Sequence, residues 1–78
     1  MKLTLELFCP SYEVVDELYA ELHGRGFNAW RCSPATHVWS VRISATPETV
    51  NYGTTVFDEL QTAHDAAKAF FEAKGLAW

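Results

Sequence analysis

The stretch from Ser11 to His23 reads SYEVVDELYAELH and constrains how the rest of the chain is arranged. Its apolar residues recur at the three- and four-residue spacing of an amphipathic α-helix. On such a helix they gather on one side: Val14, Val15, Leu18, Tyr19 and Leu22. Ser11 is a suitable N-cap, and Gly24 is a suitable residue just past the helix end. The sequence therefore predicts a first helix over Ser11–His23 that buries one side.

This helix carries four carboxylates and no Lys or Arg: Glu13, Asp16, Glu17 and Glu21, of which Glu13, Glu17 and Glu21 form a ridge opposite the apolar side. We call these four residues the acidic helix face. The helix dipole favours Glu13 and Asp16 near the N-terminus but not Glu21 near the other end. Two interpretations stay open, an ordinary solvated face or a surface that contacts a partner. Because like charges four residues apart repel, the helix by itself predicts that reversing Glu17 and Glu21 to Lys leaves stability unchanged or slightly raised.

The segments on either side of the helix alternate in polarity, as half-buried strands do. Odd-numbered residues are apolar over Leu3–Cys9, and Pro10 ends this first strand. Phe27–Cys32 follows the helix closely and predicts a second strand. The odd-numbered face of His37–Ala45 is again the more apolar one, which predicts a third. A turn at Ser33–Thr36 joins the last two strands into a hairpin.

The stretch Thr46–Phe57 carries conflicting signals. It begins with Pro47, which suits the start of a helix, but it ends with the β-prone sequence NYGTTVF. We expect a turn at Pro47-Glu48 and a fourth strand over Tyr52–Phe57. The alternative is one continuous helix from Pro47 to Lys74. Asp58 and Gln61 resemble a capping box, which places the start of the second helix at Asp58.

The element order β-α-β-β-β-α predicts a single compact α+β domain over residues 1–78. A two-layer sandwich satisfies all its apolar faces, with a mostly antiparallel four-stranded sheet and both helices on one face. The core then contains Leu3, Leu5, Leu7, Val14, Leu18, Leu22, Val41, Ile43, Leu60, Ala67 and Phe71. The other face of the sheet stays open and carries Lys2, Thr4, Glu6, Phe8, Val38, Ser40 and Arg42.

The composition argues against several classes of protein. Seventy-eight residues give room for one core and no deep cleft. Six Lys and Arg against ten Asp and Glu give a net charge of −4, which argues against direct nucleic-acid binding because phosphates need clustered bases. No apolar run is long enough to span a membrane, and charged Glu6 comes too early for a signal peptide. We therefore expect a cytoplasmic protein.

The sequence contains no catalytic, metal or nucleotide motif, so we expect neither enzyme activity nor a cofactor. Structural roles account for the histidines, His23, His37 and His64. Cys9 and Cys32 have no metal-ligand spacing and are expected to be reduced thiols. A redox role is their alternative, because both end strands that a β-α-β crossover makes parallel. Trp78 either docks back on the domain or offers an exposed anchor to a partner.

Two element orders within the chain resemble known folds. The β-α-β-β opening is similar to ferredoxin-like modules and to cell-wall-binding repeats. The β-β-β-α run is similar to double-stranded-RNA-binding domains, but the bases which that family places at the start of its last helix are replaced by DELQTAH over Asp58–His64. The resemblance therefore stops at element order.

We expect a non-enzymatic protein-interaction module that docks on a basic surface of a larger partner. The expected contact residues are Glu13, Asp16, Glu17, Glu21 and Trp78. In size, acidity and lack of motifs the chain resembles the small inhibitors that bacteriophages encode, among them anti-CRISPR proteins, which implies inhibition of a host nucleic-acid-binding complex. The alternative is a small ligand-binding or regulatory module that forms a homodimer through the open face of its sheet. Neither hypothesis involves a membrane.

Overall fold

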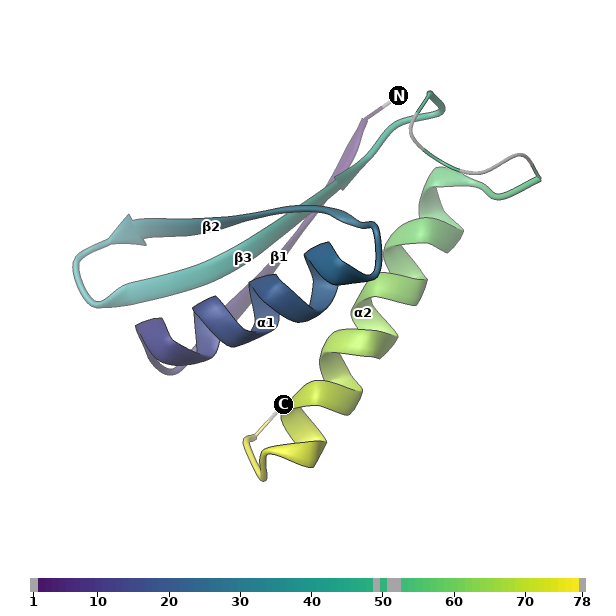
Figure 1. Ribbon diagram of the computed structural model, residues 1–78. Helices are drawn as coiled ribbons and strands as arrows, with labels where there is room; N and C mark the ends of the chain where they lie inside the picture. The colour runs from purple at the N-terminus through teal and green to yellow at the C-terminus, as the bar shows by residue number, and fades with distance from the viewer. Residues whose placement is uncertain (1, 49, 51–52, 78) are drawn as a thin grey trace.

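The computed structural model describes residues 2–48, 50 and 53–77. The elements follow in the order β1 (Leu3–Cys9), α1 (Tyr12–Gly24), β2 (Asn28–Ala35), β3 (Val38–Ala45) and α2 (Val56–Ala73) (Figure 1). Over these residues the chain is an α+β fold with two helices and a three-stranded antiparallel sheet. Neither described helix is long and apolar enough to cross a lipid bilayer.

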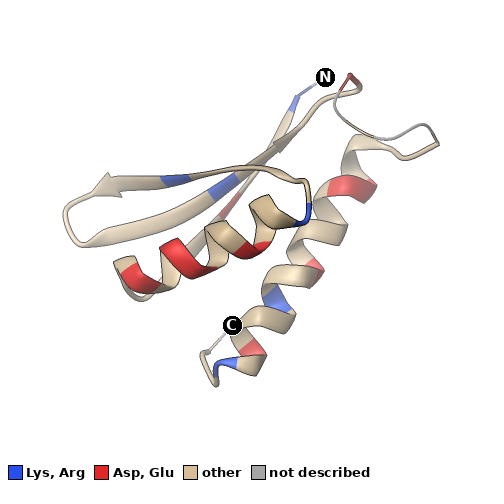
Figure 2. Cartoon of the chain, viewed as in Figure 1, with Lys and Arg blue, Asp and Glu red and all other residues tan. Residues whose placement is uncertain are grey.

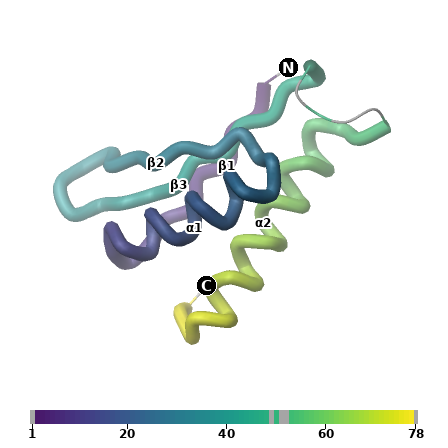
Figure 3. Tube along the Cα trace, in the orientation of Figure 1, coloured from purple at the N-terminus to yellow at the C-terminus, as the bar shows by residue number. Residues whose placement is uncertain are grey.

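The strand order is β1-β3-β2, so the last strand in sequence lies in the centre of the sheet. This central strand, β3, pairs antiparallel with both neighbours. Its pairing with β1 starts with Leu3 opposite Ala45, and its pairing with β2 starts with Asn28 opposite Ser44. The two edge strands, β1 and β2, are therefore parallel to each other, with α1 as the crossover between them. The chain trace shows α1 running back along the hairpin formed by β2 and β3 (Figure 3).

The first helix forms as the sequence predicts. Ser11 is the N-cap, and its Oγ accepts a hydrogen bond from the Val14 backbone N–H at 3.3 Å. After the helix, Gly26 has a φ of +92°, a left-handed value that favours glycine and turns the chain into β2. The buried residues of α1 are Val15, Leu18 and Leu22.

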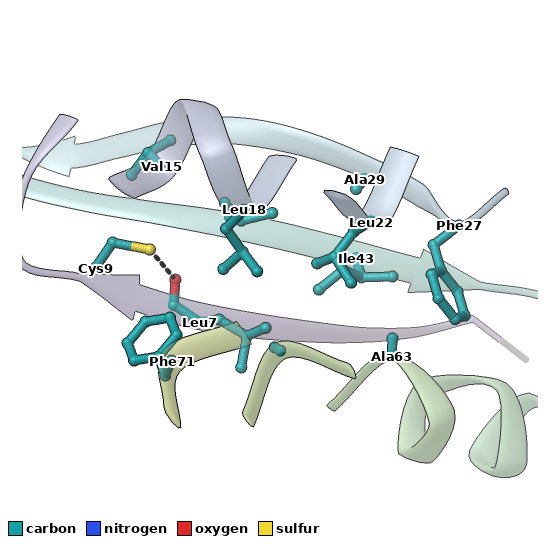
Figure 4. Packing of buried hydrophobic residues seen from close by; sticks show 12 residues of the cluster. Leu7, Cys9, Val15, Leu18, Leu22, Phe27, Ala29, Ile43, Ala63 and Phe71 are labelled. Atoms are coloured by element: carbon teal, nitrogen blue, oxygen red, sulfur yellow. Dashed lines mark hydrogen bonds between the residues drawn. The ribbon is translucent and has the colours of Figure 1, made fainter. Parts of the chain in front are cut away.

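The core combines odd-numbered side chains of the sheet with apolar side chains of both helices (Figure 4). Leu18, Leu22, Val41 and Ile43 are fully buried at its centre. Most of the predicted core is confirmed in this cluster, while three predicted members are partly buried at its border: Leu5, Val14 and Leu60. Leu3, also predicted for the core, is partly buried outside the cluster. The small residues Ala63 and Ala67 are fully buried in the same cluster on α2.

The predicted fourth strand is wrong where the structure describes it. Tyr52 lies outside the described residues, Gly53 is in a turn, and Val56 and Phe57 form the first turn of α2. The helix starts there because Thr55 is its N-cap, with Oγ1 accepting from the Asp58 backbone N–H at 3.0 Å. Burial of Val56 against the core then outweighs its preference for strands. The alternative helix starting at Pro47 is not observed either.

The hairpin turn also differs slightly from the sequence expectation. His37 has a φ of +61°, in the left-handed region, so it belongs to the turn and β3 begins at Val38. The pairing of β2 with β3 is irregular between Cys32 and Ala35. Pro34 lies in this irregular stretch on an edge strand, where a missing backbone N–H is tolerated.

Candidate functional site

Three of the four carboxylates of the acidic helix face form ion pairs. Asp16 Oδ1 lies 2.6 Å from Arg31 Nη1 of β2, and Glu21 Oε1 lies 2.7 Å from Arg25 Nη2. Glu17 pairs with Lys74, the residue that caps the end of α2. Figure 2 shows the red residues of α1 with blue residues on β2 and at the C-terminal ends of both helices. The fold thus brings to this face the positive charges that the helix itself lacks.

Aromatic rings help to hold two of these bases. The guanidinium carbon of Arg31 lies 5.2 Å from the centroid of the Tyr19 ring, and Lys74 Nζ lies 5.4 Å from that of Phe70. The hydrogen bond to Asp16 raises the pKa of Arg31 further above its usual value. Within the described part of the chain, Glu13 is the one member of the acidic helix face that has no ion pair.

Of the three ion pairs at the acidic helix face, one has a spacing that the sequence alone reveals. Arg25 follows Glu21 by four residues, which is the spacing of neighbours on a helix. Arg31 and Lys74 reach the acidic helix face through tertiary structure, so no local spacing predicts them. The structure brings Glu13, Asp16, Glu17 and Glu21 together along α1, as the sequence predicts. Trp78, the fifth predicted contact residue, lies outside the described residues.

The even-numbered face of the sheet offers a second candidate surface, which we call the sheet face. The strand register places its side chains in three rows across β1, β3 and β2. From one end of the sheet to the other the rows are Thr4-Ser44-Asn28, Glu6-Arg42-Trp30 and Phe8-Ser40-Cys32. Six of these nine residues come from β1 and β3, and five of those six were predicted from the alternation of the sequence to lie on the open face.

Arg42 lies at the centre of the sheet face and is held in place from one side. Its Nε donates to Glu6 Oε2 at 2.8 Å, and Ser40 Oγ donates to the same oxygen at 2.8 Å. These two hydrogen bonds hold the pKa of Glu6 below its usual value, while the carboxylate raises the pKa of Arg42. Ser40 is fully buried beneath its neighbours.

Two large aromatic side chains border Arg42 and are exposed to solvent. Phe8 on β1 is 59% exposed, and Trp30 on β2 is 36% exposed. They belong to opposite edge strands and therefore lie on either side of the central strand. Trp and Arg are the residue types most enriched among the side chains that dominate protein–protein binding energy. Sequence reasoning placed Phe8 on the open face but gave no role to Trp30.

The two thiols lie apart in the described structure. Burial raises the pKa of Cys9 to about 11, and its Sγ donates a weak hydrogen bond to the Leu7 carbonyl at 3.8 Å. Cys32 is also a free thiol, but it lies on the even-numbered face while Cys9 lies on the odd-numbered one. The sheet therefore separates the two sulfurs. Across residues 2–48, 50 and 53–77, no three His, Cys, Asp or Glu side chains gather to hold a metal ion.

Comparison of the chain with protein-family models, with curated proteins and with solved structures gives no match in any of the three. The acidic helix face and the sheet face, as built by the residues above, are the two surfaces from which a function is inferred.

Proposed function

We propose that this chain is a non-enzymatic protein-interaction module that binds a partner protein through its sheet face. The observation that carries the proposal is the pair of exposed aromatic residues, Phe8 and Trp30, on either side of the braced Arg42. In this proposal the sheet forms one layer and both helices form the other, so that the even-numbered side chains of the sheet can contact a partner.

Binding at this surface is favourable for two physical reasons. Removing a large apolar side chain from water contributes about 1.5–3 kcal/mol when its burial is complete, and Phe8 and Trp30 expose such surface in the free protein. Arg42 is already held by Glu6, so little side-chain entropy is lost when a partner engages its guanidinium group. The sheet face therefore fits a partner that presents apolar side chains around a carbonyl or carboxylate oxygen.

The acidic helix face supports a second candidate, docking on a basic surface of a larger partner as a phage-encoded inhibitor does. Glu13 has no ion pair within the described residues. The side chains of the three paired carboxylates remain 42–50% exposed. Since exposed ion pairs contribute little stability, bases of a partner can replace the internal ones at small cost.

A homodimer through the sheet face is less favourable than a different partner. A two-fold axis through the centre of the face places Arg42 opposite its own copy, so two like charges meet there. Analytical ultracentrifugation of the purified chain tests this, and we expect a monomer at micromolar concentration.

The test of the proposed function is affinity capture on four forms of the full chain from a lysate of the source organism. The forms are wild type, Phe8→Ser/Trp30→Ser, Glu13→Lys/Glu17→Lys and the matched control Tyr12→Ser, each first shown to be folded by circular dichroism. We expect one partner to be retained by wild type and by Tyr12→Ser and lost from the sheet-face variant. Loss confined to the charge-reversed variant assigns the contact to the acidic helix face. Retention of no protein above the bare matrix overturns the proposal.

A further inference from the structure

A third surface follows the free edge of β1, where this strand faces α2. A pocket of about 270 Å³ is lined by Leu3 and Leu5 of β1 and by Phe57, Leu60 and His64 of α2. A second pocket of about 210 Å³ follows along the same strand, lined by Leu7 and Phe8 together with Phe71 and Ala77. We call the two pockets together the β1–α2 groove. Phe57 at its entrance is 66% exposed.

The strand that borders this groove has one unpaired edge. In the described sheet β1 pairs with β3 alone, so its backbone N–H and C=O groups on the other side have no strand to bond. The Leu7 carbonyl accepts the weak hydrogen bond of the Cys9 thiol. An exposed strand edge of this kind is a template for a further strand, because main-chain hydrogen bonds supply affinity and neighbouring pockets supply specificity.

The spacing of the two pockets suits an extended segment. Their linings on β1 are centred on Thr4 and Leu7, about 10 Å apart at the rise of a strand. Their linings on α2 are centred near Leu60 and Phe71, about 16 Å apart at the rise of a helix. In an extended segment lying between the two walls, residues i and i+4 are about 13 Å apart on one face. Side chains four residues apart therefore reach both pockets.

The charges beside the groove differ from those of the rest of this acidic protein. Lys2 directly precedes β1, and Lys68 follows His64 by one turn on α2. Within the described residues neither lysine forms an ion pair, and the acid on the same row of α2 is Glu72. Asp65 contacts Gln61 and His64 at the first pocket, and Glu6, which lines the second, is already bound by Arg42 and Ser40. Lys2 and Lys68 are therefore the groups beside the groove that can pair with carboxylates of a bound segment.

We propose that the β1–α2 groove binds an extended acidic-apolar segment of a partner protein as an additional strand on β1. Apolar side chains at positions i and i+4 of the segment occupy the two pockets, and flanking carboxylates lie within reach of Lys2 and Lys68. This site shares Glu6 and Phe8 with the sheet face but does not include Trp30 or Arg42, so substitution of Trp30 distinguishes the two surfaces. A second copy of this chain pairing edge to edge through β1 is the competing occupant.

The probe is a library of random ten-residue peptides displayed on phage and selected on the immobilised full chain. We expect enrichment of peptides with large apolar residues four positions apart and nearby Asp or Glu. Titration of a selected peptide into the nitrogen-15-labelled chain is expected to shift the backbone amide signals of β1 and α2. No enrichment over an unrelated control protein, or shifts confined to β2, overturns the proposal.

Strand addition has a signature that pocket filling alone lacks. N-methylation of the selected peptide at alternate residues along the edge that faces β1 is expected to weaken binding by about tenfold or more, because hydrogen bonds to the strand are lost. N-methylation along the other edge is expected to have little effect. Equal effects on both edges contradict binding as a strand.

Variants of the protein locate the site. Phe57→Ser is expected to abolish detectable binding of the peptide, while its matched control Tyr12→Ser, an exposed aromatic on α1, retains it. Lys68→Glu is expected to weaken binding and to reduce its dependence on salt. Trp30→Ser is expected to bind like wild type, which separates this site from the sheet face. A mass that doubles with concentration, together with slowed hydrogen exchange in β1, overturns the proposal in favour of self-pairing.

Discussion

Reversing Glu17 and Glu21 to Lys is expected to destabilise the protein, which is opposite in sign to the expectation from the helix alone. In the fold Glu17 faces Lys74 at the end of α2, and Glu21 faces Arg25. The double reversal therefore replaces two attractions by two repulsions. One compensation exists, because Glu13 gains an opposite charge four residues away in place of a like one.

The magnitude follows from how exposed these pairs are. The side chains of Glu17 and Lys74 are 50% and 38% exposed, so their pair belongs to the class worth about 0.2–1 kcal/mol. The pair of Glu21 and Arg25 has helix spacing and contributes about 0.2–0.5 kcal/mol. Repulsions of similar size replace both, and the gain at Glu13 offsets part of the loss. We expect the free energy of unfolding to fall by about 1 kcal/mol at low salt.

Urea denaturation of wild type and double variant at low and at high salt measures this change, and the difference should shrink as salt screens the charges. A matched charge swap isolates the contact between the helices: Glu17→Lys/Lys74→Glu should recover most of the stability that Glu17→Lys loses. A double variant as stable as wild type at low salt, or a swap without recovery, would refute the role of Lys74 at the acidic helix face.

Three further predictions concern the core, the thiols and the stability of the fold at acid pH. Leu18→Ala should cost about 2–5 kcal/mol in urea denaturation because Leu18 is fully buried, and a loss below about 1 kcal/mol would contradict its central place. Near neutral pH a thiol reagent should modify Cys32 readily and reach Cys9, with its pKa of about 11, only after denaturation; equal rates would contradict the burial of Cys9. The folded-state pKa of Glu6 lies below its ordinary value of 4.5, so the stability that Glu6 contributes is complete at neutral pH and is lost as the pH falls below that value. Glu6→Gln should therefore lose less stability than wild type on acidification to about pH 3, as measured by urea denaturation.

Local patterns predicted most of the fold. The period-two alternation of Leu3–Cys9 and of the third strand gave the correct buried faces, because one face of each strand packs on the core. The first helix was predicted within one residue of its bounds because its cap and apolar spacing agree. The fourth strand failed because propensity favoured strand at Val56 and Phe57, while the cap at Thr55 and burial of Val56 decided for helix.

The candidate surfaces were less accessible to sequence reasoning. The sequence grouped the carboxylates of α1 correctly, but their charge is balanced by Arg31 and Lys74, whose positions depend on how β2 and α2 are placed. The bracing of Arg42 by Glu6 joins residues that are 36 positions apart. Only the register of β1 against β3 brings them together, and register between distant strands is set by the whole core.

The position of β3 between β1 and β2 also bears on the order in which the chain folds. The hairpin of β2 and β3 closes through a short turn, so it can form early at small loop-closure cost. Of the three strands of this sheet, β1 leaves the ribosome first, yet its pairing partner begins at Val38 and is completed only at Ala45. Pairing of β1 closes a long loop, and contacts of that kind form slowly. The strand synthesised first therefore joins the sheet last, and until then its apolar residues are open to chaperones and to other chains.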